Sequence, residues 1–162
     1  MARRNLRYNP KSNYSKTNTN MSHPIVQNTE KTIAKAVWAG GIGTGASYFL
    51  LKRNDAISLF GMNISEYIAD GLLIAASSVT GDLLGAYALP YAEKMVVNSP
   101  KLESMTKYAI PPALAGLQHV VIKKYGTDSD QSIGSEIALS VGSKLVADGI
   151  VDAYMSKWVT YP

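Results

Sequence analysis

The sequence predicts an all-α protein, in which about four helices form a small glycine-rich, membrane-associated bundle behind an extended basic N-terminal arm. Three observations lead to this class. The 162 residues are 46% hydrophobic and only 17% charged, which is below the roughly 25% charged residues of soluble globular domains. Four weakly apolar stretches follow one another between polar joints, and each is longer than an ordinary strand of about 3–10 residues. Several of the 13 glycines lie inside these stretches, where they would let helices approach closely.

The arm, residues 1–31, carries most of the excess positive charge of a chain whose net charge is +4. It is rich in Asn, Ser and Thr, and it has too few large aliphatic side chains to fold alone. The side chains expected to contact a partner are Arg3, Arg4, Arg7, Tyr8, Lys11, Tyr14 and Lys16. This composition suits a groove on another protein, an anionic lipid surface or, less well, nucleic acid. A solvated tail is the plainer alternative.

The body, residues 32–162, follows a sharp change in composition. Its helices are predicted near 32–51, 65–92, 108–122 and 133–159. Ala and Leu are abundant in these stretches, and Val and Ile do not alternate with polar residues as they would in a half-buried strand. N-caps are expected at Thr29, at Ser65 and at Ser132 or Ser135.

Three prolines add to this prediction. Pro111 and Pro112 are expected near the start of the third helix, where a missing N–H costs little. Pro90 is expected to kink or end the second helix, because a proline inside a helix removes one backbone hydrogen bond.

The predicted helices only partly resemble membrane spans, which need about 20 predominantly apolar residues. The first and third approach that length if their flanking lysines reach the interface. The second and fourth contain acidic and basic residues, each of which costs about 2.5–3.5 kcal/mol at the bilayer centre. They would therefore cross the bilayer only inside a bundle, and lying on its surface is the alternative. The Lys and Arg distribution puts both termini on the cytoplasm-like side.

Small residues recur at every fourth position in two of these stretches. Gly41 and Gly45 form a GxxxG pair in the first, and Ser77, Gly81 and Gly85 continue the same spacing in the second. Such spacing places small residues on one helix face, where backbones of neighbouring helices come together in lipid. We therefore expect helix packing at these five positions. A loop at the GGIGTG segment is the alternative.

Ionisable residues also recur at helical spacing. The predicted polar stripe comprises Asp70, Asp82, Lys144, Asp148 and Asp152, with Glu136 and Ser140 on the same face of the fourth helix. One interpretation is a hydrophilic path through a bundle. The other, which the sequence favours, is an amphipathic helix whose charged face meets water or a partner protein.

No recognised catalytic motif occurs in the chain, so we expect neither an enzyme nor a bound cofactor. The absence of cysteine excludes disulfides, thiolate metal sites and a thiol nucleophile. Two histidines cannot form a multi-histidine metal site alone, and His119 is expected to be a hydrogen-bonded packing residue.

A basic Asn-, Ser- and Tyr-rich arm ahead of a small glycine-rich helical body resembles, in its layout, the minor capsid and membrane proteins of large icosahedral DNA viruses with an internal lipid layer. The resemblance implies a structural protein of the virion inner membrane, with Arg3–Lys16 contacting the capsid shell and the helices held in or on the membrane. Membrane lipid and capsid-like proteins would then be its partners, with a second copy of the chain as a further one. The alternatives are a small multi-span channel or transporter subunit and a soluble helical interaction module.

Overall fold

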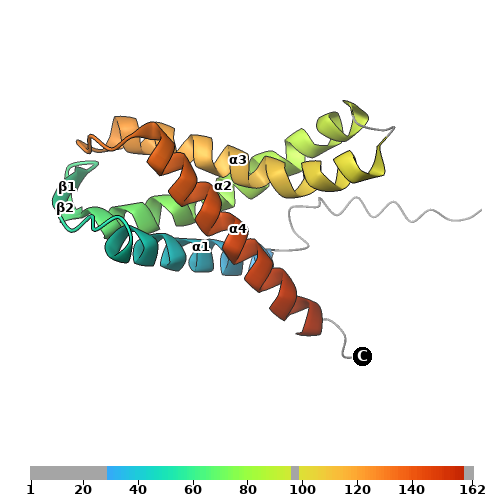
Figure 1. Ribbon diagram of the computed structural model, residues 1–162, viewed down its shortest axis with the longest axis horizontal. Helices are drawn as coiled ribbons and strands as arrows, with labels where there is room; N and C mark the ends of the chain where they lie inside the picture. The colour runs from blue at the N-terminus through green and yellow to red at the C-terminus, as the bar shows by residue number, and fades with distance from the viewer. Residues whose placement is uncertain (1–28, 96–98, 159–162) are drawn as a thin grey trace, which may run out of the picture.

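The computed structural model describes residues 29–95 and 99–158. These form α1 (Thr29–Phe49), β1 (Ala56–Leu59), β2 (Met62–Ser65), α2 (Glu66–Met95), α3 (Pro100–Gly126) and α4 (Ile133–Trp158), as Figure 1 shows. The predicted all-α class with four helices is confirmed, with one short hairpin as an addition. Most of the predicted arm lies outside the described residues.

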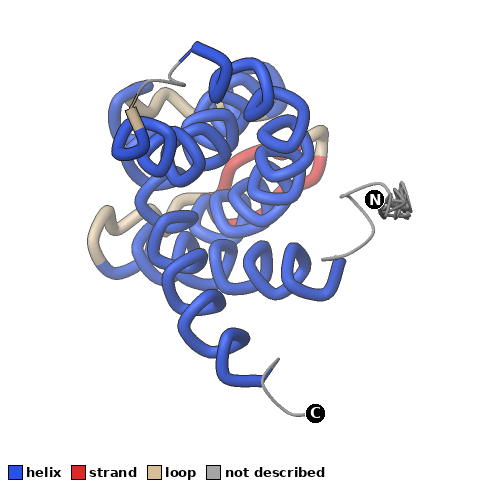
Figure 2. The backbone as a smooth tube through the Cα atoms, turned by 90° about the vertical axis from the view of Figure 1, so that its right-hand side faces the viewer, coloured by secondary structure: helices blue, strands red, loops and turns tan. Residues whose placement is uncertain are grey.

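The four helices form a ring in which each helix packs against two others. α1 contacts α2 and α4, and α3 contacts the same two helices, whereas the diagonal pair α2 and α4 touches at few residues. Seen from the side in Figure 2, the helices surround a common interior and the hairpin closes its far end. Because successive helices run in opposite directions, α1 begins and α4 ends at the end away from the hairpin (Figure 1).

Glycines allow the closest helix contacts. At Gly40 in α1, an added Cβ would lie 2.9 Å from the carbonyl oxygen of Gly71 in α2. At Gly81 it would lie 2.8 Å from the Pro111 oxygen and from the Ala115 Cβ of α3. Gly85 lies equally close to Pro111. These contacts bring α2 against both of its neighbours at backbone distance.

The expectation for Gly41 and Gly45 is wrong within this chain. Among the described residues, no atom beyond the local backbone of α1 lies within 4 Å of a Cβ built on either residue, so both face away from the other helices. The GGIGTG run offers glycines on several helix faces, and it is Gly40 and Gly43 that face α2. By contrast, Ser77 is buried, and Gly81 and Gly85 lie at the α3 contact as expected.

The hairpin was not predicted from the sequence. β1 and β2 pair antiparallel through a two-residue turn at Phe60 (φ 48°) and Gly61 (φ 85°). Positive φ at both turn residues matches the twist of the two strands. Ile57 and Leu59 are buried with Ala69 and Leu73 of α2, so the hairpin covers the end of the bundle.

The prolines lie inside helices and not at their ends. α3 begins at Pro100, eight residues before the predicted start, so Pro111 and Pro112 fall within it. Likewise, α2 continues past Pro90 to Met95, so Pro90 does not end this helix, and the kink stays a prediction. In α3, packing of the fully buried Pro112 inside the bundle helps to offset the lost backbone hydrogen bonds. The predicted cap at Ser132 is confirmed, since its Oγ accepts a hydrogen bond from the Ser135 N–H at 3.3 Å.

Replacing Gly81 by Ala should lower the free energy of unfolding by about 1–3 kcal/mol, because its Cβ would overlap backbone atoms of α3 that cannot move aside. The matched control is Gly41→Ala, which should stabilise the chain by about 0.5–1 kcal/mol through helix propensity alone. Thermal unfolding followed by circular dichroism measures both variants. Equal effects of the two substitutions would contradict the packing described here.

Candidate functional site

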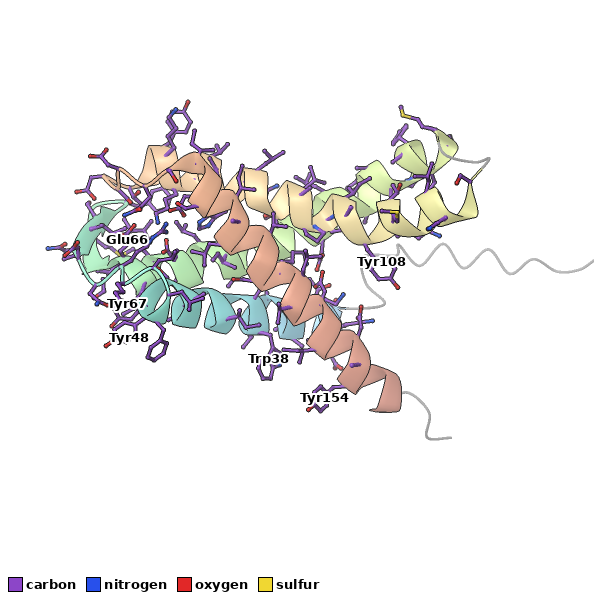
Figure 3. All side chains as sticks on the ribbon, viewed as in Figure 1. Trp38, Tyr48, Glu66, Tyr67, Tyr108 and Tyr154 are labelled. Atoms are coloured by element: carbon purple, nitrogen blue, oxygen red, sulfur yellow. The ribbon has the colours of Figure 1, made fainter. Side chains whose placement is uncertain are left out.

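The most unusual feature of the bundle is a group of buried charged side chains at its hairpin end, which we call the Lys123 cluster. It consists of Arg53, Glu66, Asp70, His119, Lys123 and Glu136. All six are buried, although Arg, Lys, Glu and Asp are almost never fully buried unless they are paired. Figure 3 shows Glu66 at this end, among polar side chains between the helices.

The Lys123 ammonium lies at the centre of the cluster. Its Nζ is 3.0 Å from Glu66 Oε1 and 3.1 Å from Glu136 Oε1, and it also donates to Asp70 Oδ1. The Arg53 Nη1 is 2.6 Å from the same Glu136 Oε1 and 3.0 Å from Asp70 Oδ2. Two cations therefore share three carboxylates, which offsets the cost of burying each charge.

Backbone contacts place Arg53 at the cluster although it lies in a loop. Its N–H donates to the Ser47 carbonyl at the end of α1 at 3.1 Å, and its own carbonyl accepts from the Tyr67 N–H of α2 at 3.2 Å. The residue before it, Lys52, has a positive φ of 54°, which turns the chain sharply after α1. The cluster thus connects α1, its following loop and the other three helices.

His119 forms the remaining contact of the cluster. Its Nε2 lies 2.8 Å from Glu136 Oε2, and its ring is fully buried. Because a carboxylate accepts hydrogen bonds, Nε2 is the donor and Nδ1 is left as an acceptor. No hydrogen-bond partner for Nδ1 occurs among the described residues. With a neutral His119 the cluster has one more negative than positive charge, and a protonated His119 would balance it.

A second group, the Lys144 cluster, lies toward the other end of the bundle. It consists of Lys31, Lys35, Asp82, Lys144, Asp148 and Asp152. The fully buried Lys144 Nζ is 2.7 Å from Asp82 Oδ1 and 3.1 Å from Asp148 Oδ1. Lys35 continues the series by pairing with both Asp148 and Asp152. Three lysines and three aspartates make this cluster neutral, and it becomes more exposed toward Lys31.

Buried hydroxyl groups lie between the two clusters. Ser77, Ser78, Ser140 and Ser143 are all buried. Lys144 donates to Ser78 Oγ at 3.3 Å, whereas Ser140 Oγ has no partner among the described residues. Together the clusters and serines form a polar column. It runs along α2 from Glu66 to Asp82, a distance of about 24 Å at the helical rise per residue.

A cavity with charged residues in its lining lies at each end of this column. One, of about 440 Å³, lies beneath the loop from Thr127 to Gln131 and is lined by Lys123 and Glu136. The other, of about 340 Å³, is lined by Lys35, Asp82 and Asp148. Members of both clusters therefore face a cavity as well as each other.

Distance alone would allow a metal ion at the Lys123 cluster, since ligand atoms of Asp70, His119 and Glu136 lie within 4.8 Å of one another. However, the Lys123 and Arg53 cations already contact both carboxylates. The positive charge that a metal would supply is thus provided by side chains, and the geometry does not support a metal centre here.

The structure separates the sequence-predicted polar stripe into two parts. Asp70 belongs to the Lys123 cluster, and Asp82, Lys144, Asp148 and Asp152 belong to the Lys144 cluster. The expectation that this face of α4 meets water or a partner is wrong for Glu136 and Lys144, which are buried inside the ring. The arm residues Arg3, Arg4, Arg7, Tyr8, Lys11, Tyr14 and Lys16 lie outside the described residues.

Four members of the Lys123 cluster were not among the predicted site residues: Arg53, Glu66, His119 and Lys123. His119 and Lys123 are four residues apart and share a helix face, which was the available signal. Arg53 has no such signal, because it lies in a loop and its partners are distant in sequence.

Comparison of the chain with protein-family models, curated proteins and solved structures yields no match, so its geometry and chemistry carry the functional argument.

Replacing Lys123 by Met should destabilise the protein by about 3–5 kcal/mol, because three buried carboxylates would then share only Arg53. The control is the exposed neighbour, Lys124→Met, whose effect should stay within about 0.5 kcal/mol. Chemical unfolding measures these differences, and similar losses in both variants would contradict the central position of Lys123.

Proposed function

We propose that the chain is a membrane-embedded structural protein, whose helices lie in lipid and whose basic arm docks on a protein assembly. One observation carries the membrane part of this proposal: charged side chains are buried inside the ring, while large apolar side chains cover its outside. Trp38 and Tyr154 are examples, and Figure 3 shows them directed away from the bundle.

The outer surface suits lipid better than water. Among the described residues, exposed large apolar side chains outnumber buried apolar ones, and many of the buried ones are alanines. Large continuous apolar surfaces are rare on soluble monomers. In α1, α2 and α4 the apolar residues are spread around the helix and do not form one stripe, which is typical of helices with apolar surroundings on all sides.

The composition of the helices gives weaker support. Of the described helices, α2 alone is long and apolar enough by itself to cross a membrane. The other helices carry too many polar residues to pass that test. Their charges pair inside the ring, however, and this pairing would remove much of the cost of placing them in a bilayer.

The proposed anchoring role depends on the basic arm as well as on the helical body. A basic segment with interspersed tyrosines precedes α1, and no recognised catalytic motif accompanies it. A body held in the bilayer and a cationic segment that binds outside it would connect a membrane to a protein shell, as in the minor capsid proteins that the chain resembles. The polar interior would then hold the helices in one arrangement.

A charge on the outer face of α2 tests the membrane placement. Leu72 is 57% exposed, and in lipid Leu72→Asp should cost about 2.5–3.5 kcal/mol and reduce membrane insertion. Met62→Asp in the hairpin is the control, because Met62 is equally exposed at 58% but lies outside the helices. Resistance to carbonate extraction and flotation with vesicles measure insertion. Recovery of the wild-type chain as a soluble monomer without detergent would support the soluble interaction module instead.

Deleting residues 1–28 tests the docking role of the arm. The truncated chain retains all four helices, so it should float with vesicles as the full chain does. It should lose most of its association with the native protein assembly, because the cationic segment is gone. Co-sedimentation with the assembly purified from the source compares the two chains, and equal recovery would refute docking through the arm.

A further inference from the structure

We propose that the polar column conducts protons through the bundle, from the cavity at the hairpin end to the cavity at the Lys144 cluster. This inference rests on the proposed membrane placement, because a proton path has a function only where it connects two compartments. Its length of about 24 Å along α2 is close to the thickness of the hydrocarbon core, about 30 Å.

The path begins at the cavity beneath the loop that precedes α4. Lys123 and Glu136 line this cavity and also belong to the Lys123 cluster, so they join the outside to the buried groups. The polar groups of Asp128, Ser129 and Asp130 surround the entrance. Ser129 Oγ donates to Glu66 Oε1 at 2.8 Å, which gives a second hydrogen-bonded connection to the cluster.

His119 provides the central transfer step. For a proton that comes from the Lys144 side, arrival at the unpartnered Nδ1 would create an imidazolium, and the proton on Nε2 could then pass to Glu136 Oε2, 2.8 Å away, which lines the cavity at the hairpin end. The ring thus accepts a proton on one nitrogen and releases one from the other, with no net change in its charge. A proton that enters from the hairpin end takes the reverse route, from Glu136 to the Nε2 of the tautomer that is protonated on Nδ1, and a proton then leaves from Nδ1.

Ser140 marks the continuation of the path. It is fully buried one helical turn after Glu136, and its Oγ has no partner among the described residues. Buried polar atoms without a protein partner are the usual positions of internal water. One turn further along α4, Lys144 contacts Ser78, Asp82 and Asp148, and the two aspartates line the second cavity.

The occupants of the column favour protons over metal cations. Lys123, Arg53 and Lys144 already fill the positions between the carboxylates at hydrogen-bond distance. A metal cation would have to displace these side chains, whereas a proton can pass when a lysine gives one proton to a carboxylate on one side and takes up another from the other side. The column is therefore a candidate path for protons and a poor one for hydrated cations.

The test uses the full chain in vesicles of phosphatidylcholine and phosphatidylglycerol that contain a trapped pH-sensitive dye. Flotation on a density gradient and circular dichroism are measured first, so that membrane insertion and folding are known before any flux. A potassium gradient with valinomycin then drives protons. We expect acidification or alkalinisation, according to the sign of the potential, faster than in protein-free vesicles.

Two substitutions in the path should reduce this flux, each by at least about tenfold. His119→Gln keeps a donor toward Glu136 but cannot transfer a proton through a ring. Ser140→Leu fills the space beside the unpartnered hydroxyl and excludes water. The control is Ala138→Leu, two residues away on the exposed side of α4, which should conduct as the wild type does.

Each outcome decides between the proposals. A chain that does not float with vesicles would overturn the membrane placement and the proton path together. A chain that floats with wild-type helicity and conducts no protons would overturn the proton path alone. Flux that is equal in all variants, or that follows a sodium gradient and not the proton-motive force, would also overturn it. If Ser140→Leu fails to fold, the result for His119→Gln decides.

Discussion

Pairing of buried charges is the constraint on which the arrangement of this protein depends. Asp70 and Glu136 each contact both Arg53 and Lys123, so that moving either carboxylate removes an ion pair from both cations. An unpaired buried charge costs several kcal/mol, whereas a fully paired set costs little. Because the partners come from α2, α3, α4 and the loop after α1, this one requirement determines how these segments lie relative to each other.

Small residues make the charged interior possible. Gly40, Gly71 and Gly81 allow α2 to approach α1 and α3 at backbone distance, which brings side chains of moderate length into contact across the ring. The few buried apolar side chains, such as Ile74 and Leu139, fill the space that remains. The interior therefore has little of the large aliphatic core that stabilises most soluble bundles, and specificity comes from ion pairs and close backbone contacts.

The hairpin and the loop before α4 cover the end of the bundle at which the Lys123 cluster lies. Leu59 forms an isolated bridge with Thr127, and the Phe60 N–H donates to the Gly126 carbonyl at 2.9 Å, so the hairpin is joined to the end of α3. The hairpin thus covers apolar residues of α2, while the cavity beside it leaves Lys123 and Glu136 accessible from the loop. The hairpin covers one part of this end of the bundle, and the cavity at the loop before α4 occupies the other. A buried cluster and a route to it can therefore occur together.

Residue types and spacing were enough to predict four helices, their approximate limits and the charged faces of α2 and α4, since these depend on local backbone preferences and helical periodicity. The hairpin was missed because Phe60-Gly61 lacks the usual Asn-Gly or Asp-Gly turn signal, and its strands have four residues each. The eight residues of α3 before Tyr108 were missed, because Pro111 and Pro112 were expected near the start of the helix. Which glycines meet a neighbour and which carboxylate binds which cation depend on helix rotation and on contacts between residues far apart in the chain. The packing of all four helices determines these contacts. A charged helix face is stable either in water or against oppositely charged side chains, and only the positions of the other helices determine which of these it meets.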